Sequence, residues 1–327
     1  MDIVGHHKMK EQLKVAITAA KKRNTSLPHM LFSGAAGCGK TSSARYIADM
    51  TDSPFMSVVP NDLKDYNSIF VMLDRLNHDG YSSIGDKIGT IKPTVVFIDE
   101  VHNLPVKGQE LMGLVMERFM IESNKPDLYH WVPYFTLIGA TTLAGKLTKP
   151  FRDRFKLTFN FQPYNMSEMN EIVRMHTRRL GVRCTPSSIN EIAKRSRGTP
   201  RIAVGYIERV RDRLTACDSR VATIGLTKDV FDEIEVDEEG FTKLEIRLLK
   251  VLMDSGNPVS LDNLSVILQE DSKSVRDFAE PYLIRKCMIE VSGRGRVITE
   301  KGRQHLKNSG KTKKLVKELV KFNYERR

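Results

Sequence analysis

The sequence has few of the residues that build disulfide frameworks or zinc sites. Among its 327 residues there are four cysteines, and no two of them form a C-x-x-C pair. This argues against a zinc site and a disulfide framework, and it fits a reducing cytosol. No apolar run approaches the ~18 residues of a membrane-spanning helix, and the N-terminus has no apolar segment of the signal-peptide kind. We therefore expect a cytoplasmic protein with no membrane partner.

Acidic residues are in the minority. The chain carries 52 Lys and Arg against 40 Asp and Glu, a formal net charge of +12. From Lys301 to Arg327, ten basic residues face two glutamates, so this end alone carries +8. Nucleic acid is the leading partner class for such a balance. The tail 307–327 is expected to bind phosphate without reading sequence, or else to serve as a solubilising end.

One glycine-rich stretch organises the rest of the chain. Gly34 to Thr41 reads G-x-x-x-x-G-K-T, the pattern of a loop whose backbone N–H groups cradle phosphate, and an apolar run precedes it as a buried parallel strand would. A helix is expected to follow, with a dipole that favours an anion. Lys40 should reach the β- and γ-phosphates of ATP, and the Thr41 hydroxyl should ligate Mg²⁺. A chance glycine turn is the alternative. The nucleotide-binding residues predicted in this stretch are Gly34, Gly37, Gly39, Lys40, Thr41 and Ser42.

A second motif lies about 60 residues further along. Thr94 to Ile98 form an apolar strand that ends in two carboxylates, Asp99 and Glu100. At the C-terminal end of a strand, Asp99 can hold the Mg²⁺ of the nucleotide, and Glu100 can polarise the attacking water as general base. A plain acidic turn is the alternative, but after a P-loop at this spacing the paired interpretation is favoured.

Strands alternate with helices over the first half of the chain, which predicts a doubly wound α/β domain with a parallel sheet. Ligands bind such sheets beyond the C-terminal ends of the strands, where Asp99, Glu100 and Thr142 all fall. Further elements are expected as helices at 8–23 and 107–122, a helix through Ile69, Leu73 and Leu76, and strands at 54–59 and 135–142.

The N-terminal segment gives weaker signals. Ile3 and Val4 are apolar enough to touch an adenine ring, although a simple turn into the first helix explains them equally well. His6 and His7 have no evident metal partner and are expected at the surface.

After the expected sheet domain the pattern changes to helices. Arg152 and Arg154 flank an aspartate; this could be a surface ion pair, but its place just after the last strand favours a nucleotide role. From Tyr164 onwards helices are expected at 167–180 and 187–196, with a third beginning after Thr199. Arg201 in the first turn of that helix opposes the helix dipole, and a bound triphosphate would reverse this preference. We therefore interpret this segment as a lid.

The last part predicts a smaller domain after an acidic linker at 236–240. Helices at 242–253, after Ser260 and at 272–286, the last interrupted at Pro281, precede short strands at 288–291 and 297–299. Three helices and a hairpin form a winged helix, with Arg294 and Arg296 on the wing aimed at phosphate, unless they belong to a solvated basic turn. The expected domains are 1–162, 163–238 and 239–306, followed by the basic tail 307–327.

With these motifs in place, the sequence resembles the RuvB family, the hexameric AAA+ motors of Holliday-junction branch migration, from about Ile3 to about Leu306. The stretches that carry the resemblance are Phe97-Ile-Asp-Glu-Val-His102, Phe135-Thr-Leu-Ile-Gly-Ala-Thr-Thr142, Arg152-Asp-Arg-Phe155, Arg197-Gly-Thr-Pro-Arg-Ile-Ala203, Glu280-Pro-Tyr-Leu283 and Gly293-Arg-Gly-Arg296.

The resemblance implies a role for each matching position. Thr142, or Thr141, is similar to the sensor near the γ-phosphate, and Arg201 to the second sensor on the lid. Arg154, with Arg152, resembles the finger that reaches a neighbouring subunit's nucleotide; which of the two is the main finger stays open. It further implies ATP and Mg²⁺ as cofactors, a homo-oligomeric ring, duplex DNA of a four-way junction as substrate, and a RuvA-type partner. The remaining positions are Tyr164, Ile3 and Val4 at the base end of the nucleotide, and Arg294 and Arg296 on DNA.

The sequence departs from the family pattern in several places. Ala35, Ala36 and Cys38 replace the prolines and leucine usual in the loop, Val291 stands at a basic position of the wing, and the tail is an addition. The segment 121–134 occupies the place of the family's RuvA-docking hairpin but looks short, and it lacks apolar alternation. The compact sequence suits a phage or mobile-element version, and the altered segment 121–134 predicts weak or absent dependence on a standard RuvA.

Two other functions share parts of this pattern. A clamp loader or helicase loader would have the same fold and ATP site, but such proteins typically carry a Ser-Arg-Cys finger and a helical collar, where this chain has Arg152-Asp-Arg154 and a winged helix. A non-catalytic ATP-binding scaffold would not need Lys40, Asp99 and Glu100 together. The motor is therefore the favoured interpretation.

Overall fold

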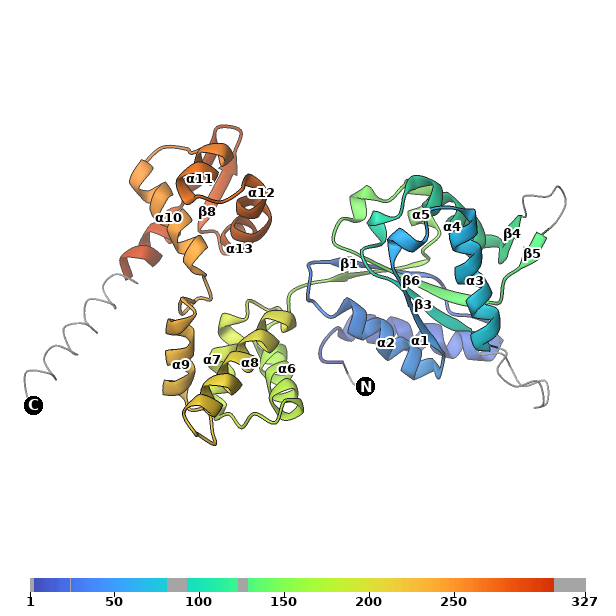
Figure 1. Ribbon diagram of the computed structural model, residues 1–327, viewed down its shortest axis with the longest axis horizontal. Helices are drawn as coiled ribbons and strands as arrows, with labels where there is room; N and C mark the ends of the chain where they lie inside the picture. Colours follow the sequence, from blue (N-terminus) through green and yellow to red (C-terminus); the bar gives the residue numbers. More distant parts are fainter. Residues whose placement is uncertain (1–2, 24, 81–92, 123–128, 309–327) are drawn as a thin grey trace, which may run out of the picture. The chain divides into compact units, whose positions relative to one another are not determined.

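A computed structural model describes residues 3–23, 25–80, 93–122 and 129–308 of the chain (Figure 1). The chain folds as two compact units, and the division passes through the helical segment. The first unit comprises residues Met1–His176 and Gly198–Val204, and the second comprises Thr177–Arg197 and the rest from Gly205 onwards.

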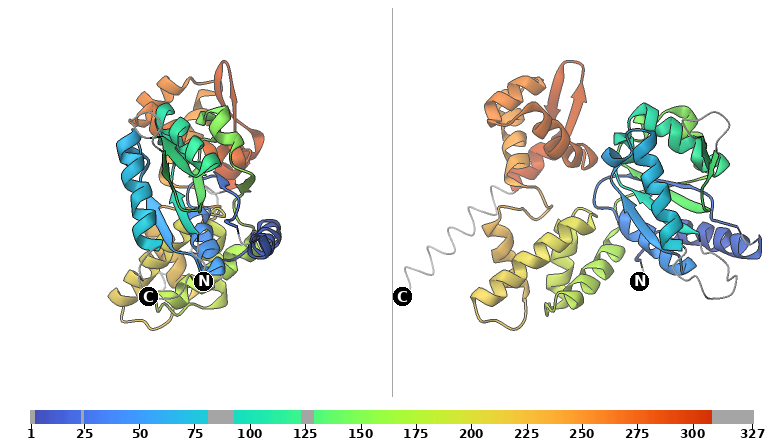
Figure 2. Two further views of the ribbon diagram at one scale, coloured as in Figure 1. Left: turned by 90° about the vertical axis from the view of Figure 1, so that its right-hand side faces the viewer. Right: turned by 45° about the vertical axis from the view of Figure 1, so that its right-hand side comes forward.

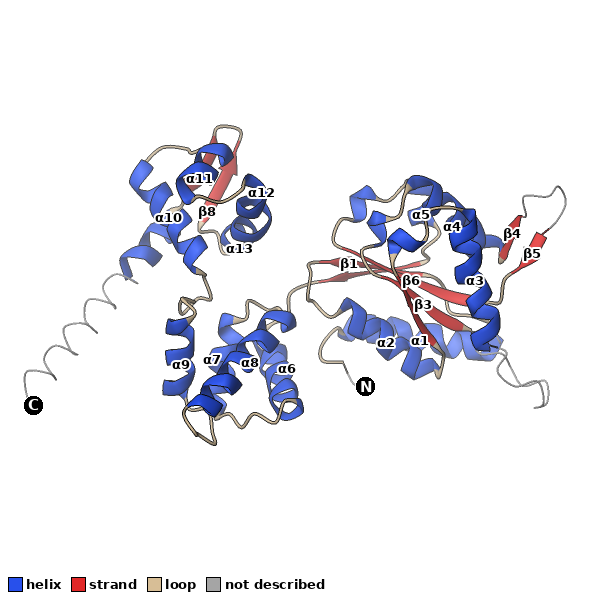
Figure 3. Ribbon diagram, in the orientation of Figure 1, coloured by secondary structure: helices blue, strands red, loops and turns tan. Residues whose placement is uncertain are grey.

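The first unit is built on a five-stranded parallel sheet in the order β2-β3-β6-β1-β7 (Figure 3). Its central strands β3 and β6 are buried along their whole length, as expected of strands covered on both faces. This confirms the predicted α/β domain. The strands are β1 (Met30–Gly34), β2 (Phe55–Val58), β3 (Thr94–Ile98), β6 (Phe135–Thr141) and β7 (Leu157–Phe161).

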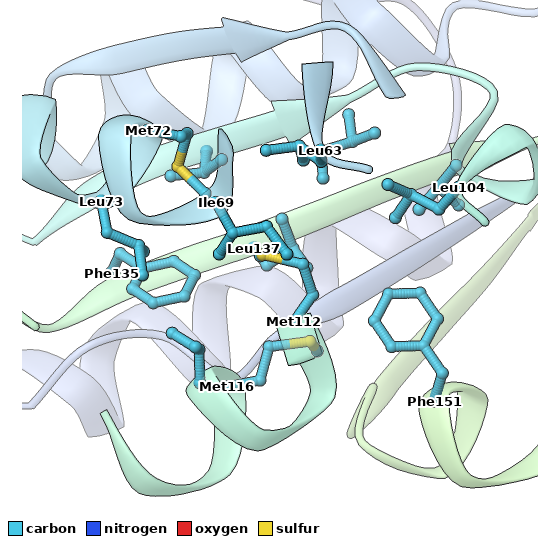
Figure 4. Close-up of a cluster of buried hydrophobic side chains, with 14 of the residues drawn as sticks. Leu63, Ile69, Met72, Leu73, Leu104, Met112, Met116, Phe135, Leu137 and Phe151 are labelled. Carbon is cyan, nitrogen blue, oxygen red and sulfur yellow. The ribbon is translucent and has the colours of Figure 1, made fainter. Parts of the chain in front are cut away.

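Helices cover both faces of this sheet because successive strand residues point to opposite sides. On β3, Val96 and Ile98 enter one core with α3, α4 and α5 (Figure 4), whereas Val95 and Phe97 enter the other core with α1 and α2. The helices of this unit are α1 (His7–Arg23), α2 (Lys40–Thr51), α3 (Tyr66–Gly80), α4 (Val106–Arg118) and α5 (Lys149–Asp153), with short 3₁₀ turns η1 (Pro60–Asp62), η2 (Val101–Asn103) and η3 (Ala144–Lys146).

The helix expected at 107–122 is shorter than predicted. It ends at Arg118 because Phe119 adopts the left-handed region, with φ of 51°. The chain then forms β4 (Met120–Glu122), which pairs antiparallel with β5 (Tyr129–Trp131), with Met120 opposite Trp131. The apolar spacing through Ile121 fits a helix and a strand alike, and pairing with a separate segment of the chain decided the outcome.

The segment after Tyr164 is all-helical, as predicted. It contains α6 (Met166–Arg179), α7 (Pro186–Arg195), α8 (Pro200–Ala216) and α9 (Ile224–Glu233), the last of which is not predicted from the sequence. Thr185 and Thr223 cap α7 and α9 by accepting hydrogen bonds from the N–H groups of Ser188 and Leu226.

The C-terminal part confirms a winged helix, and its β8–β9 hairpin stands out from the helices (Figure 2). The predicted break before Pro281 is a π-helical turn that ends at Ala279, where the missing proline N–H removes a helical hydrogen bond. Phe241, Leu248 and Leu283 lie fully buried in the core of this domain. The elements are α10 (Lys243–Ser255), α11 (Leu261–Leu268), α12 (Ser272–Ser274), the π-helical turn η4 (Val275–Ala279), α13 (Glu280–Arg285), β8 (Ile289–Ser292) and β9 (Gly295–Ile298).

No helix in the described part of the chain has the length and apolar character needed to cross a membrane.

Candidate nucleotide-binding and hydrolysis site

The loop after β1 has the backbone that its glycines predict. Gly34 and Gly39 have φ of +141° and +90°. A Cβ at Gly34 would lie 2.3 Å from the Phe161 carbonyl oxygen, and one at Gly39 would lie 2.8 Å from the Tyr164 hydroxyl. Both positions therefore need glycine for conformation and for space. Gly39 is the N-cap of α2, so the unpaired N–H groups of the first helical turn open toward the loop.

A cavity of about 440 Å³ lies against this loop and gathers most of the predicted site. It brings together the P-loop, the two acidic residues after β3 and the start of α8, which are far apart in the sequence. Its lining includes Gly37, Gly39, Lys40, Thr41, Ser42, Asp99, Glu100, His176 and Arg201.

Lys40 is buried, with 6% of its surface exposed, and its ammonium group is held by the loop itself. Nζ donates to the carbonyl oxygens of Gly34 and Ala35 at 2.8 and 3.0 Å. Burial lowers the pKa of Lys40, and the charges of Glu100 and Asp99 partly oppose that shift. An ammonium group held in this way in a cavity rimmed by N–H groups suits an incoming phosphate.

Glu100 is anchored to the end of the neighbouring strand β6. Its Oε2 accepts hydrogen bonds from the N–H and the hydroxyl of Thr142 at 3.1 and 3.0 Å, and it lies 3.1 Å from Nδ1 of His102. The backbone of Glu100 is left-handed, with φ of 46°, an uncommon conformation for a residue with a side chain. The fold thus holds this carboxylate in a fixed place beside Asp99.

The sequence predicts no role for His102, although this residue ends the motif from Phe97 to His102. Its Nδ1 also lies 2.9 Å from the hydroxyl of Thr141, which in turn accepts the N–H of Leu143. A carboxylate can only accept a hydrogen bond, so the favourable tautomer of His102 is the one that carries its proton on Nδ1 and donates to Glu100. Of the two threonines left open by the sequence, Thr142 contacts Glu100, and Thr141 is fully buried behind it.

The donor set fits Mg²⁺. The Thr41 hydroxyl and the Asp99 carboxylate line the same cavity, and oxygen ligands of this kind are what Mg²⁺ prefers. Within the described residues no three His, Cys, Asp or Glu side chains come together as a metal cage. An ion at this site would therefore take most of its ligands from phosphate and water, the usual arrangement for Mg²⁺ in nucleotide sites.

Arg201 reaches the cavity from the first turn of α8. Its side chain and that of Thr199 pack on the phosphate loop, since a Cβ at Gly37 would lie 2.8 Å from Cβ of Arg201 and 3.0 Å from Cγ2 of Thr199. Gly198 continues this contact by accepting a hydrogen bond from the Tyr164 N–H at 2.9 Å. The unfavourable cation noted in the sequence therefore faces the place where a triphosphate would lie.

The predicted base end is organised around Tyr164. Its hydroxyl lies 2.7 Å from Nε2 of His6, and the His6 ring packs 4.6 Å from that of Phe161. His7 is exposed, as expected, whereas His6 is half-buried; burial lowers the pKa of His6 and raises the pKa of Tyr164. Ile3 lies buried in the core of α1 and α2, and Val4 is half-buried. Neither Ile3 nor Val4 lines the P-loop cavity.

Arg154 lies outside the cavity at the phosphate loop. Its Nη1 donates to the Pro150 carbonyl oxygen at 2.7 Å, its Nη2 lies 3.2 Å from Oε2 of Glu117, and its side chain packs on Gly113. It lines a second cavity of about 620 Å³ together with His29, Asp153 and others. Arg152 is exposed. Neither arginine is thus placed to contact a nucleotide held by its own chain's P-loop cavity.

The two arginines of the wing differ. Arg294 is exposed in the turn between β8 and β9. Arg296 lies within β9, and its Nε and Nη2 donate to the two carboxylate oxygens of buried Glu280 at 2.6 and 3.1 Å. Only 14% of the Arg296 side chain is exposed, and its guanidinium is directed at Glu280, whereas the sequence predicted that it would be aimed at phosphate. A buried carboxylate needs a paired cation, and Arg296 supplies it.

Comparison with known proteins agrees with this architecture. Three family profiles match consecutive parts of the chain: the Holliday junction DNA helicase RuvB P-loop domain over residues 1–161, the RuvB AAA lid domain over 164–237 and the RuvB C-terminal winged helix domain over 238–307.

Whole proteins match as well. The chain is 36% identical over 312 residues to the Holliday junction branch migration complex subunit RuvB of Campylobacter concisus (strain 13826), covering 92% of this chain and 87% of that protein. It is 34% identical over 317 residues to the subunit of that name from Helicobacter pylori (strain ATCC 700392 / 26695), covering 94% of this chain and 89% of that protein. The solved structure of the Thermotoga maritima RuvB Holliday junction branch migration motor is similar with a TM-score of 0.73 and 30% identity, over 93% of this chain and 95% of that one. The chain therefore belongs to the RuvB family.

Proposed function

We propose that this protein is an ATP-driven motor that migrates Holliday-junction branches during recombination and repair. One observation carries the proposal: Lys40, Thr41, Asp99, Glu100 and Arg201 meet in one cavity, in a chain that matches branch-migration subunits over most of its length. The lid and the winged helix of those relatives are present too.

Each residue of the cavity takes one role in ATP hydrolysis. Lys40 binds the β- and γ-phosphates, and Arg201 contacts the γ-phosphate from the lid side. Thr41 and Asp99 would hold Mg²⁺, which neutralises charge that develops on the phosphates. Glu100 orients and polarises the attacking water, and its three side-chain contacts described above all fall on Oε2. Thr142 senses the γ-phosphate because any shift of its N–H or hydroxyl moves Glu100.

Hydrolysis requires a second copy of the chain. Arg154 lines a cavity different from the one at the P-loop, which favours action on a neighbouring subunit's nucleotide over action on its own. The Glu117 side chain of its ion pair is largely exposed, and exposed ion pairs contribute little free energy. The Arg154 guanidinium can therefore leave Glu117 for a phosphate at small cost in free energy. We infer a homo-oligomeric ring, of six subunits as in the family, with Arg154 as the main finger and Arg152 beside it.

The base of ATP binds at the other end of the loop. Tyr164 with His6 borders this region, and a cavity of about 490 Å³ opens beside them. Ile3 and Val4 are proposed to border the base through their backbone, because the Ile3 side chain is buried and neither residue lines this cavity.

DNA binds at the wing through its backbone. Arg294 is the proposed phosphate contact, and Arg296 contributes by fixing the hairpin against α13. A motor must step past any sequence, so contacts to phosphate suit it better than contacts to bases. The substrate is duplex DNA of a four-way junction.

A RuvA-type partner is proposed to dock on the β4–β5 hairpin. Trp131 at its end is 74% exposed and Tyr134 just beyond is 65% exposed. Exposed aromatic side chains of this kind are common anchors of protein interfaces. Residues 123–128, between β4 and β5 in the sequence, lie outside the described residues, and so does most of the basic tail, residues 309–327.

The proposal is tested by ATP-dependent migration of a synthetic four-way junction, with and without a RuvA protein. We expect migration with ATP and Mg²⁺ and none with the Lys40→Ala variant, which lacks the phosphate-binding ammonium group. ATP hydrolysis without migration, whichever RuvA is supplied, would favour a clamp-loader or helicase-loader function instead.

A further inference from the structure

Arg197 is a heavily bonded arginine at the junction between the lid and the winged helix. Its Nε donates to the Gly240 carbonyl oxygen at 2.7 Å, and its Nη1 and Nη2 donate to the two carboxylate oxygens of Glu245 at 2.8 and 2.6 Å. The guanidinium also lies over the Tyr282 ring, 4.3 Å from the centroid. Glu245 is 1% exposed on its side chain and Arg197 10%, so this is a buried bidentate pair.

The linker between the two domains is held from both sides. Arg195 donates from Nη1 to the Val236 carbonyl oxygen at 2.7 Å, and a Cβ at Gly240 would lie 2.6 Å from the Arg195 carbonyl oxygen. From the winged-helix side, the Tyr282 hydroxyl donates to the Glu239 carbonyl oxygen at 2.7 Å. The acidic linker at 236–240 is therefore held by packing and hydrogen bonds from both domains.

The contacts of Arg195, Arg197 and Tyr282 with the linker form a clamp, and two lysines and one histidine add to it. Lys194 of α7 and Lys286 after α13 both pair with the Glu239 carboxylate, at 3.4 and 3.2 Å. His305 lies 2.7 Å from Asp237, whose other carboxylate oxygen accepts the N–H groups of residues 239 and 241. Both of these linker carboxylates thus have partners that belong to packed elements.

Arg197 is also only four residues before Arg201, which faces the nucleotide cavity. At the start of this segment, Arg197 and Gly198 both adopt the left-handed backbone region, with φ of 58° and 71°. The division between the two compact units falls between these same two residues. One short segment that contains a glycine therefore connects Arg201 to Arg197.

We propose that Arg197 and Glu245 are a positioning pair that joins the winged helix rigidly to the adjoining lid helices, so that both move as one body about Gly198. The motion produced at the nucleotide is then delivered to the wing without loss in the linker. Neither residue lines the cavity at the phosphate loop. The proposal rests on the proposed function only for its junction assay.

Two native cysteines make the rigidity measurable in the full-length chain. Cys217 after α8 and Cys287 between α13 and β8 are exposed, whereas Cys38 is buried and Cys184 is half-buried. With Cys184→Ser as background, spin labels on Cys217 and Cys287 report the distance across the joint. We expect one narrow distance population, unchanged by Mg²⁺ with a non-hydrolysable ATP analogue. A broad distribution, or one that shifts with nucleotide, would overturn the proposal.

Conservative substitutions then test the pair itself. Arg197→Lys keeps the charge but loses the two-pronged contact and the bond to Gly240, and Glu245→Gln keeps the oxygen that caps α10 at Thr242 but loses the charge. Both should broaden the distance distribution. The matched control is Lys243→Ala, which removes an exposed ion pair with Glu235 in the same region and should leave the distribution narrow.

The junction assay separates positioning from chemistry. Both variants should hydrolyse ATP without DNA at the wild-type rate, while branch migration per ATP falls about 2- to 30-fold, the range of coupling changes produced by residues that touch neither ligand. Wild-type migration per ATP in both variants would contradict the proposal. If the wild type moves no junction, the proposed function fails, and the distance measurement still decides whether the joint is rigid.

Discussion

Replacing each wing arginine alone should separate DNA contact from support of the wing. Arg296→Ala removes the cation that pairs with Glu280, whose side chain is 4% exposed. Breaking a buried ion pair in this way costs about 3–5 kcal/mol, because an uncompensated carboxylate remains in the interior. Arg294→Ala removes an exposed side chain at a turn and should change stability by less than about 0.5 kcal/mol.

Hydrogen–deuterium exchange of peptides that cover α13 and the β8–β9 hairpin measures this difference locally. A loss of about 3 kcal/mol or more corresponds to amide exchange faster by roughly 10²-fold or more in the Arg296→Ala variant. Exchange in Arg294→Ala should match the wild type. The second measurement is the affinity for duplex DNA over a series of salt concentrations. Arg294→Ala should make the slope of log K against log salt less steep by about 0.9, the value of one phosphate contact.

The opposite pattern would refute this assignment. If Arg296→Ala exchanges like the wild type yet loses the salt slope of one phosphate contact, Arg296 leaves Glu280 to bind DNA. The pair seen in the folded chain would then be a resting arrangement. Basal ATP hydrolysis serves as the control and should stay intact in both variants, because the wing contributes nothing to the nucleotide cavity.

Four further outcomes follow from the sites described. Glu100→Gln should retain ATP binding but hydrolyse about 10²-fold more slowly or worse, as expected on loss of a general base, and turnover equal to wild type would exclude this role. Arg154→Ala should bind ATP and hydrolyse it about 10³-fold more slowly, and mixing it with Lys40→Ala subunits should restore some activity; if no ratio does so, Arg154 does not act in trans. His29 is buried between the Met116 carbonyl oxygen and the Leu137 N–H, and burial lowers its pKa to about 4. Because the unfolded chain then binds more protons than the folded chain between pH 6.5 and 4, the free energy of unfolding should fall by up to about 3 kcal/mol as the pH falls through that window. Urea unfolding of His29→Gln should show a smaller loss over the same window, and equal losses in the two proteins would contradict this. Deletion of the tail 307–327 should flatten the salt dependence of duplex binding, and an unchanged slope would show that the tail does not contact DNA.

The sequence alone determined the parts of this protein that depend on local pattern. Glycine spacing requires a backbone that few other residues adopt, which is why the loop from Gly34 to Thr41 could be placed before the structure was known. Apolar runs of strand length followed by polar residues located Asp99 and Thr142 at the edge where the nucleotide cavity lies. Helical and strand periodicities likewise predicted the parallel sheet and the winged helix.

Tertiary structure decided which distant residues each side chain meets. His102 meets Thr141 across 39 residues, Tyr164 meets His6 across 158, and Arg197 meets Glu245 across 48. The wing shows the consequence most clearly. The turn beside Arg296 suggested a side chain aimed at phosphate, but the fold pairs this arginine with the buried carboxylate of Glu280, 16 residues away. Periodicity reports the backbone and the buried face of a segment, but it carries no information about which partner the fold brings to that face. For this reason the nucleotide loop could be predicted from the sequence, whereas the clamp on the linker and the support of the wing could not.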